Sequence, residues 1–239
     1  MDDRDPFAVT NRQPTPTRPL LGLTILVVED SRFACEAMRL LCLRSGARIR
    51  RADCLKSARR HLQTYRPSVI IVDLGLPDGS GVDLIAELTG AVPRVSVILG
   101  TSGDDFAETA AIAAGADGFL SKPVSSLAGF QHEVLSRLPQ DRQPVGPRII
   151  TDEEIQPDHM AYQDDMAHVA DVLNDQNDEQ VLDYVAQFVG GVARSAQDSV
   201  LADAAARLAQ SRASGAPVAT DMARIAGLVQ ERLEQKRAI

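Results

Sequence analysis

The sequence predicts a parallel α/β domain followed by an all-α region, and three observations support this fold class. From residue 22 to about residue 138, short apolar runs alternate with longer amphipathic runs. The short runs are continuous in Val, Ile and Leu, as expected for strands that helices cover on both faces. After residue 160, apolar residues recur only at helical spacing. We therefore expect a (βα)5 doubly wound parallel sheet of five strands, and then a helical region.

The expected strands are short segments that precede polar or turn-forming residues, and most of them are apolar runs. Such runs end in short polar or Gly-containing segments, which turn the chain toward the next helix. The expected strands are 23–30, 47–53, 68–73, 95–102 and 116–123.

Each helix is expected in the amphipathic segment that follows a strand. The first one has Ser31 at its N-cap position and Gly46 just past its end, residues that favour helix initiation and termination respectively. The expected helices are 31–46, 54–65, 82–90, 104–115 and 125–138.

Polar side chains stand at the ends of four of these strands. In a doubly wound sheet, ligands bind at the carboxyl edge of the strands, close to the switch in strand order. Three carboxylates would repel one another there unless a hard divalent cation or a lysine compensated their charge. A lysine and a hydroxyl can also bind a phosphoryl oxygen. The strand-end residues are Glu29, Asp30, Asp73, Thr101 and Lys122.

This constellation resembles the receiver domain of two-component response regulators, which has a flavodoxin-like, CheY-like fold. The resemblance covers residues 22 to about 138. Five separately placed signatures carry it: VVED at 27–30, VDLGLPDGSG at 72–81, the Thr of LGTSG at 101, the Phe of GFLSKP at 119, and Lys122-Pro123.

The resemblance implies a role for each signature residue. By role they are: phosphoacceptor, Asp73; Mg²⁺ ligands, Glu29, Asp30, Asp73 and the backbone carbonyl of Gly75; phosphoryl-binding residues, Thr101 and Lys122; switch residues, Thr101 and Phe119. It also implies that side chains two positions after the acceptor and two after the switch threonine affect the lifetime of the aspartyl phosphate. Both positions are glycine here, Gly75 and Gly103, and neither offers a side chain.

The function that the resemblance implies is phosphoacceptor signalling rather than enzymatic turnover. The receiver would take a phosphoryl group from a histidine kinase or a histidine phosphotransfer protein, and would catalyse only its own phosphorylation and dephosphorylation. We expect four parts in the chain: a disordered N-terminal tail at 1–20, the receiver domain at 21–138, a Pro-rich linker at 139–160, and a helical output or dimerisation region at 161–239.

Composition limits where the protein acts. The tail lacks the basic and apolar regions of a signal peptide, and no apolar run in the chain approaches the ~18 residues of a membrane span. We therefore expect a cytoplasmic protein without membrane contacts. The three cysteines, Cys35, Cys42 and Cys54, show no CxxC spacing and predict neither a disulfide framework nor a zinc site.

The helical region carries an apolar stripe that needs a partner surface. Val181, Val185, Val189 and Val192 recur at steps of three and four. We expect one long helix, interrupted at most at Gly190-Gly191, and a second helix joined to it through 215–217 as an antiparallel hairpin. Such a hairpin has little core of its own, so a homodimer through these helices is expected. The alternative is that the stripe packs within the monomer.

The two halves of the chain differ in net charge, and this difference limits the kind of partner that the helical region can bind. Residues 1–138 carry 16 acidic and 16 basic residues, whereas residues 139–239 carry 17 acidic and 9 basic residues and so hold the whole net charge of −8. Nucleic-acid binding requires clustered cations, so we expect a downstream protein partner rather than nucleic acid. Two alternatives remain: a DNA-binding transcription regulator with an atypical helical output domain, and a phosphorelay component that uses His168.

Overall fold

The computed structural model of the chain describes residues 13–104, 106–175 and 179–235. In this part of the chain, no helix combines the length and the apolar character needed to cross a membrane.

A five-stranded parallel sheet forms the first half, as the sequence predicts. Its strand order is β2-β1-β3-β6-β7, so the direction of strand addition reverses between β1 and β3. A short antiparallel pair, β4 and β5, follows β3 and leads into the next helix. The strands are β1 (Thr24–Val28), β2 (Arg48–Ala52), β3 (Val69–Asp73), β4 (Gly75–Leu76), β5 (Gly79–Ser80), β6 (Val97–Ser102) and β7 (Gly118–Ser121).

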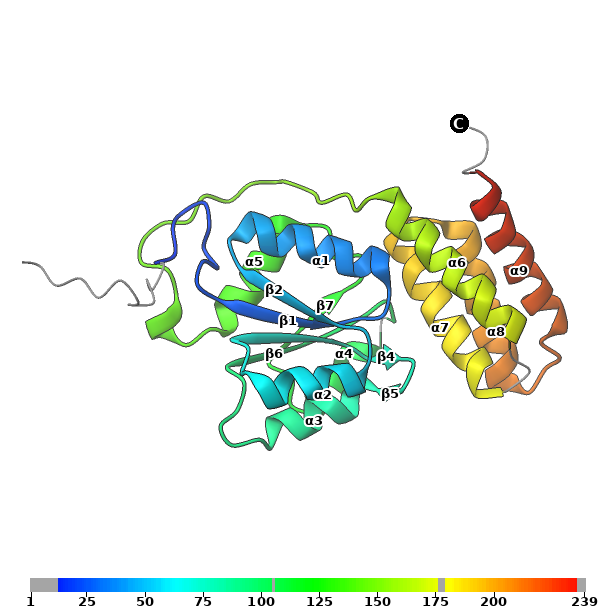
Figure 1. The fold of residues 1–239 in the computed structure, drawn as a ribbon, viewed down its shortest axis with the longest axis horizontal. Coiled ribbons are helices and arrows are strands. Elements are labelled where there is room, and N and C mark those ends of the chain that lie inside the picture. The colour runs from blue at the N-terminus through cyan, green and yellow to red at the C-terminus, as the bar shows by residue number, and fades with distance from the viewer. Residues whose placement is uncertain (1–12, 105, 176–178, 236–239) are drawn as a thin grey trace, which may run out of the picture.

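Helices cover both faces of the sheet, which confirms the doubly wound class (Figure 1). Two of them pack on one face, where Met38 and Phe130 join the core, and three pack on the other face around Ile85. The first face carries α1 (Arg32–Ser45) and α5 (Leu127–Arg137); the second carries α2 (Leu55–Thr64), α3 (Gly81–Thr89) and α4 (Ala107–Ala113).

The ends of α1 follow the expected capping chemistry. The side chain of Ser31 accepts a hydrogen bond from the amide of Ala34, and Gly46 adopts a left-handed conformation with φ of 85°. A residue with a Cβ atom would be strained at that φ, so glycine ends the helix without cost.

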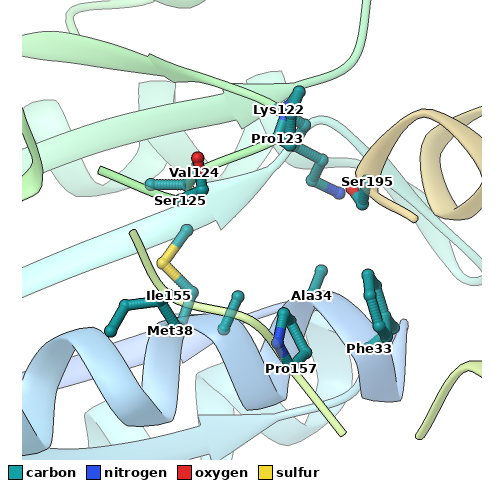
Figure 2. A pocket seen from close by; sticks show the side chains of 11 residues that line it. Phe33, Ala34, Met38, Lys122, Pro123, Val124, Ser125, Ile155, Pro157 and Ser195 are labelled. Atoms are coloured by element: carbon teal, nitrogen blue, oxygen red, sulfur yellow. The ribbon is translucent and has the colours of Figure 1, made fainter. Parts of the chain in front are cut away.

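The segment that joins the two halves packs on the receiver. A short 3-10 helix (Gln140–Arg142) follows α5, and further along Ile155 is buried in the core on the α1 and α5 face. The amide of Ile155 donates to the carbonyl of Ser125 at 2.8 Å. Figure 2 shows Ile155 and Pro157 between α1 and the loop that follows Lys122. The pocket left there has a volume of only about 30 Å³, so the segment fits closely.

The expected N-terminal tail lies partly within the described residues. Residues 1–12 lie outside them, whereas Leu20 is fully buried in the core of the receiver. Thr15 and Arg18 form an isolated β-bridge just before it. Packing of the receiver therefore begins before residue 21.

Four helices form the second half of the chain: α6 (His159–Asp175), α7 (Glu179–Ser195), α8 (Ser199–Ser214) and α9 (Ala219–Glu234). They pack into a bundle with a core of its own, in which Val189, Leu201 and Ile225 are fully buried. Gly215, in a left-handed conformation, ends α8 and starts the turn to α9, as the sequence indicated.

The expected long helix is wrong, because the chain breaks at residues 196–198. Gln197 adopts a positive φ of 58°, and Asp198 then caps α8 by accepting a hydrogen bond from the amide of Leu201. Gly190 and Gly191 lie inside α7 and do not interrupt it. The boundary between α7 and α8 is thus set by Asp198, which caps α8, and not by the glycine pair.

The predicted valine stripe is buried inside the monomer's own bundle. Val185, Val189 and Val192 are each at most 2% exposed, against residues of α6, α8 and α9. The stripe therefore needs no second copy of the chain to cover it. The buried stripe no longer supports a homodimer, and dimerisation stays a prediction.

The bundle docks on the receiver at the N-terminal end of α1 (Figure 1). The carboxylate of Asp165, on α6, is 1% exposed. It accepts hydrogen bonds from the hydroxyl of Ser31 at 2.8 Å and from the amides of Arg32 at 2.8 Å and Phe33 at 3.0 Å. An anion is favourable at a helix N-terminus, where amide groups lack partners and the helix dipole is positive. Asp165 thus joins the two halves.

Replacing Asp165 with alanine should destabilise the protein. The change leaves a buried hydroxyl and two amides without acceptors, at a cost of about 1–3 kcal/mol in the free energy of unfolding. The neighbouring Asp164→Ala is the control, because Asp164 makes an exposed ion pair with Arg32 that contributes about 0–1 kcal/mol. Denaturant unfolding of both variants measures the difference, and equal losses would contradict the role of Asp165.

Candidate phosphorylation site

The five strand-end residues predicted from the sequence meet at the carboxyl edge of the sheet. Asp73 ends β3, and the parallel register places Thr101 of β6 directly beside it. Glu29 and Asp30 follow β1, which is the other neighbour of β3. Lys122 follows β7 on the far side of β6. The strand order therefore brings together residues that lie up to 93 positions apart in the sequence.

Lys122 forms two buried ion pairs at this edge. Its Nζ lies 2.9 Å from Oδ2 of Asp73 and 2.7 Å from Oε2 of Glu29. Burial would lower the pKa of Lys122, but the charges of Asp73 and Glu29 outweigh that effect and raise it. The raised pKa keeps Lys122 cationic at neutral pH.

Three carboxylates share this one ammonium group. Glu29, Asp30 and Asp73 each offer an oxygen within 4.8 Å of the other two. Burial is the main cause of a pKa of Glu29 well above its ordinary value, and the charge of Asp73 adds to it. Burial likewise raises the pKa of Asp30 to about 7, although a hydrogen bond from Tyr184 opposes the shift. When all three carboxyl groups are ionised, the cluster carries more negative charge than Lys122 compensates.

A divalent cation fits this excess of carboxylate oxygen. Oε2 of Glu29 is buried and accepts no hydrogen bond of good geometry from the described residues, despite its ion-pair contact with Lys122. Oxygen donors of this kind are those that Mg²⁺ prefers, one or two carboxylates together with waters and a phosphoryl oxygen. Gly75, whose carbonyl is the fourth expected ligand, lines the same cleft as Asp73.

The two expected switch residues are close to the site but directed elsewhere. Thr101 is fully buried, and its hydroxyl donates to the carbonyl of Leu120 at 2.7 Å. To donate to a phosphoryl oxygen it would have to leave that carbonyl. Phe119 is half-buried and packs against the core on the α2, α3 and α4 face. Their roles stay predictions.

Helix α7 brings to the site a residue that sequence reasoning missed. The hydroxyl of Tyr184 donates to Oδ2 of Asp30 at 2.7 Å, and burial together with the charge of Asp30 raises the pKa of Tyr184. Nε2 of the exposed His168 lies 3.3 Å from the same hydroxyl. No sequence signal tied Tyr184 to the receiver, because the periodicity of a helix does not reveal what its polar side faces.

A cleft of about 730 Å³ separates the sheet edge from the bundle. The receiver contributes Asp73, Lys122 and the loop that follows β6, and the bundle contributes residues of α7 and α8. The candidate phosphoacceptor thus opens onto a space that both halves of the chain enclose.

The family model of the response regulator receiver domain matches residues 25–131. This segment is a receiver domain. It includes every site residue predicted from the sequence, from Glu29 to Lys122. The match ends within α5, so that helices α6 to α9 lie outside it.

Curated relatives resemble a part of the chain that is similar in length to the receiver match. The KDP operon transcriptional regulatory protein KdpE of Escherichia coli (strain K12) is 37% identical over 101 residues, which cover 41% of this chain and 44% of KdpE. The probable transcriptional regulatory protein TcrX of Mycobacterium tuberculosis is 33% identical over 104 residues, which cover 43% of this chain and 44% of TcrX. The matched segment spans less than half the length of each relative.

Solved structures match about half of the chain. A putative response regulator from Chloroflexus aurantiacus has a TM-score of 0.45 and 26% sequence identity, and the match covers 48% of this chain and 96% of that chain. A two-component response regulator from Clostridium difficile has a TM-score of 0.44 and 20% identity, over 48% of this chain and 94% of that chain.

Mg²⁺ binding should weaken as the pH falls through neutrality. The pKa of Asp30 is raised to about 7, and a ligand carboxyl must be ionised, so below that pH the metal has to displace a proton. The affinity should be roughly tenfold lower at about pH 6 than at about pH 8. Isothermal titration calorimetry measures both values.

Asp30→Asn is the control for this pH dependence. The variant lacks the titrating carboxyl group and should bind Mg²⁺ more weakly, with a smaller change between the two pH values. Equal affinity of the unmodified protein at both pH values would contradict the raised pKa of Asp30.

Proposed function

We propose that this chain is a two-component response regulator that accepts a phosphoryl group on Asp73, with Mg²⁺, from a histidine kinase or a histidine phosphotransfer protein. The observation that carries the proposal is the carboxylate of Asp73 at the mouth of a cleft, paired with Lys122 and flanked by two further carboxylates. The receiver domain match supports phosphoryl acceptance as the type of chemistry.

In the proposed reaction, a carboxylate oxygen of Asp73 attacks the phosphorus of a partner's phosphohistidine. A new P–O bond forms while the P–N bond breaks, and the imidazole nitrogen keeps the electron pair of that bond. Lys122 already contacts the reacting carboxylate and can pair with an oxygen of the transferred group. Mg²⁺, held by Glu29, Asp30 and Asp73, would neutralise charge on the phosphoryl oxygens.

Hydrolysis reverses the modification at the same place. Water attacks the phosphorus and the P–O bond to Asp73 breaks, so that inorganic phosphate is released and the carboxylate is regenerated. The chain would thus promote only its own phosphorylation and dephosphorylation, and its signal is the conformational state of the phosphorylated protein.

The helical bundle is the proposed output region, acting through contacts with a downstream protein or a second copy of the chain. Acidic residues outnumber basic residues in this half of the chain: 17 acidic and 9 basic residues follow residue 138. This balance is unfavourable beside a phosphate backbone.

DNA binding is the second candidate output. KdpE and TcrX are named as transcriptional regulatory proteins, so the comparisons do not support our expectation that nucleic acid is not a partner. Their similarity covers 41% and 43% of this chain. Salt-dependent binding of random-sequence duplex DNA by the phosphorylated protein would favour this candidate over a protein partner.

Phosphorylation should require Asp73. Incubation with acetyl phosphate and Mg²⁺ should add one phosphoryl group to the protein, seen by intact mass, and chelation of the metal should prevent it. Asp73→Asn should abolish the addition, since an amide is not a nucleophile here. The control is Asp83→Asn, an exposed carboxylate on α3, which should be phosphorylated normally. An unchanged mass gain in Asp73→Asn would refute the proposed acceptor.

A further inference from the structure

Helix α7 presents one polar stripe to the cleft. Tyr184, Gln187, Gly191 and Arg194 follow one another at steps of three, four and three residues, which places them on one side of a helix. Tyr184 contacts Asp30, and the other three line the cleft together with Asp73. Of the apolar residues of α7, Val185 and Val189 pack in the bundle core, whereas Phe188 and Val192 belong to that core and also line the cleft.

Two glycines of the receiver make room for this stripe. A Cβ atom at Gly75, two residues after Asp73, would collide with the side-chain amide of Gln187. A Cβ atom at Gly103, two residues after Thr101, would lie 2.7 Å from Nε and 2.9 Å from Nη2 of Arg194. The loops beside the phosphoacceptor therefore lack side chains where α7 supplies them.

The guanidinium group of Arg194 has N–H donors for which the described residues provide no acceptor. Its Nε is buried without a hydrogen-bond partner, and within the described part of the chain its guanidinium group makes no hydrogen bond or ion pair. A buried donor left unpaired is costly, which suggests an acceptor that joins later. Arg212 lines the same cleft but is paired with Asp183 at 2.9 and 3.1 Å.

Ser195, which follows Arg194 in the sequence, shows that this end of α7 lies close to Lys122. Ser195 lines a small pocket together with Lys122 and Pro123 (Figure 2). Arg194 itself lies against the loop after β6, the strand directly beside β3. The end of α7 thus lies near the residues that follow β6 and β7, the two strands on this side of β3.

A phosphoryl group on Asp73 would change the charge of the cleft. The phosphoryl group carries about 1.5 to 2 negative charges and three acceptor oxygens, where the free carboxylate of Asp73 carries one charge, and it joins a cluster in which Lys122 already pairs with Glu29 and Asp73. An arginine can donate two parallel hydrogen bonds to such a group, with better directionality than a lysine.

We propose that Arg194 is a second cationic ligand of the phosphoryl group on Asp73, supplied by the helical bundle to the receiver. The inference rests on the proposed function, since it names a further residue of the same site. Its consequence is regulatory: phosphorylation strengthens the contact between the bundle and the receiver, and by thermodynamic reciprocity that contact strengthens binding of the phosphoryl group.

Beryllofluoride with Mg²⁺ is the probe for this test, because it mimics a phosphoryl group on a carboxylate. The thermal midpoint of the full chain, followed against beryllofluoride concentration, gives the apparent affinity. Arg194→Ala should bind the mimic roughly 10- to 100-fold more weakly, as expected for loss of a hydrogen bond between charged groups. Arg194→Lys should fall between, because it keeps the charge and loses the paired donors.

Two further variants distinguish a specific contact of Arg194 with the phosphoryl group from a general effect of positive charge in the cleft. Arg212→Ala removes a cleft arginine that already has a partner and should bind the mimic like the unmodified protein. Gly103→Ala keeps every charge but adds a methyl group from which the flexible end of Arg194 must move away, so it should weaken mimic binding, but less than Arg194→Ala does. Thermal midpoints without the mimic report whether each variant is folded.

The outcomes distinguish this inference from the function on which it rests. Weaker binding in Arg194→Ala and Gly103→Ala, with normal binding in Arg212→Ala, supports the proposal. Unchanged affinity in a folded Arg194→Ala, or equal losses in Arg194→Ala and Arg212→Ala, overturns it, while phosphorylation of Asp73 still stands. If the unmodified chain neither binds the mimic nor is phosphorylated on Asp73, both proposals are refuted.

Discussion

The excess of negative charge at the carboxyl edge of the sheet is the constraint on which the rest of the structure depends. Glu29, Asp30 and Asp73 lie within 4.8 Å of one another, beside the single ammonium group of Lys122. Removing several carboxylates from water is costly unless cations or donors offset it. The described residues supply the ammonium group of Lys122, the phenol hydroxyl of Tyr184 and the backbone amides of Ser31 and Gly75. The negative charge that these groups leave uncompensated is available to bind a metal ion and to take part in chemistry on a phosphoryl group.

The helical bundle is organised around this edge rather than attached at a distance from it. Asp165 accepts from the N-terminus of α1, next to the loop that carries Glu29 and Asp30, and Tyr184 reaches Asp30 itself. The connecting segment is fixed to the receiver through Ile155. A change of charge at Asp73 therefore acts directly on contacts between the two halves, without any long path through the sheet.

The receiver and its site could be predicted from the sequence because their signals are local and ordered. Apolar runs mark the strands, and parallel pairing forces Asp73 and Lys122, each at a strand end, to the same edge. The break at Gln197 was missed because one residue with a positive φ leaves little trace in helical periodicity. The contacts of Tyr184 and Arg194 could not be foreseen, since they depend on how two separately folded units pack together.

The central claim is that the bundle and the receiver share one phosphoryl site, and amide hydrogen exchange along α7 tests it most directly. The measurement compares residues 184–194 in the full chain with Mg²⁺ alone and with Mg²⁺ and beryllofluoride. The account predicts slower exchange in this segment when the mimic is bound, because Arg194 gains an acceptor and α7 is held against the receiver. Exchange that is unchanged or faster in α7, with slower exchange confined to the receiver loops, would contradict a shared site.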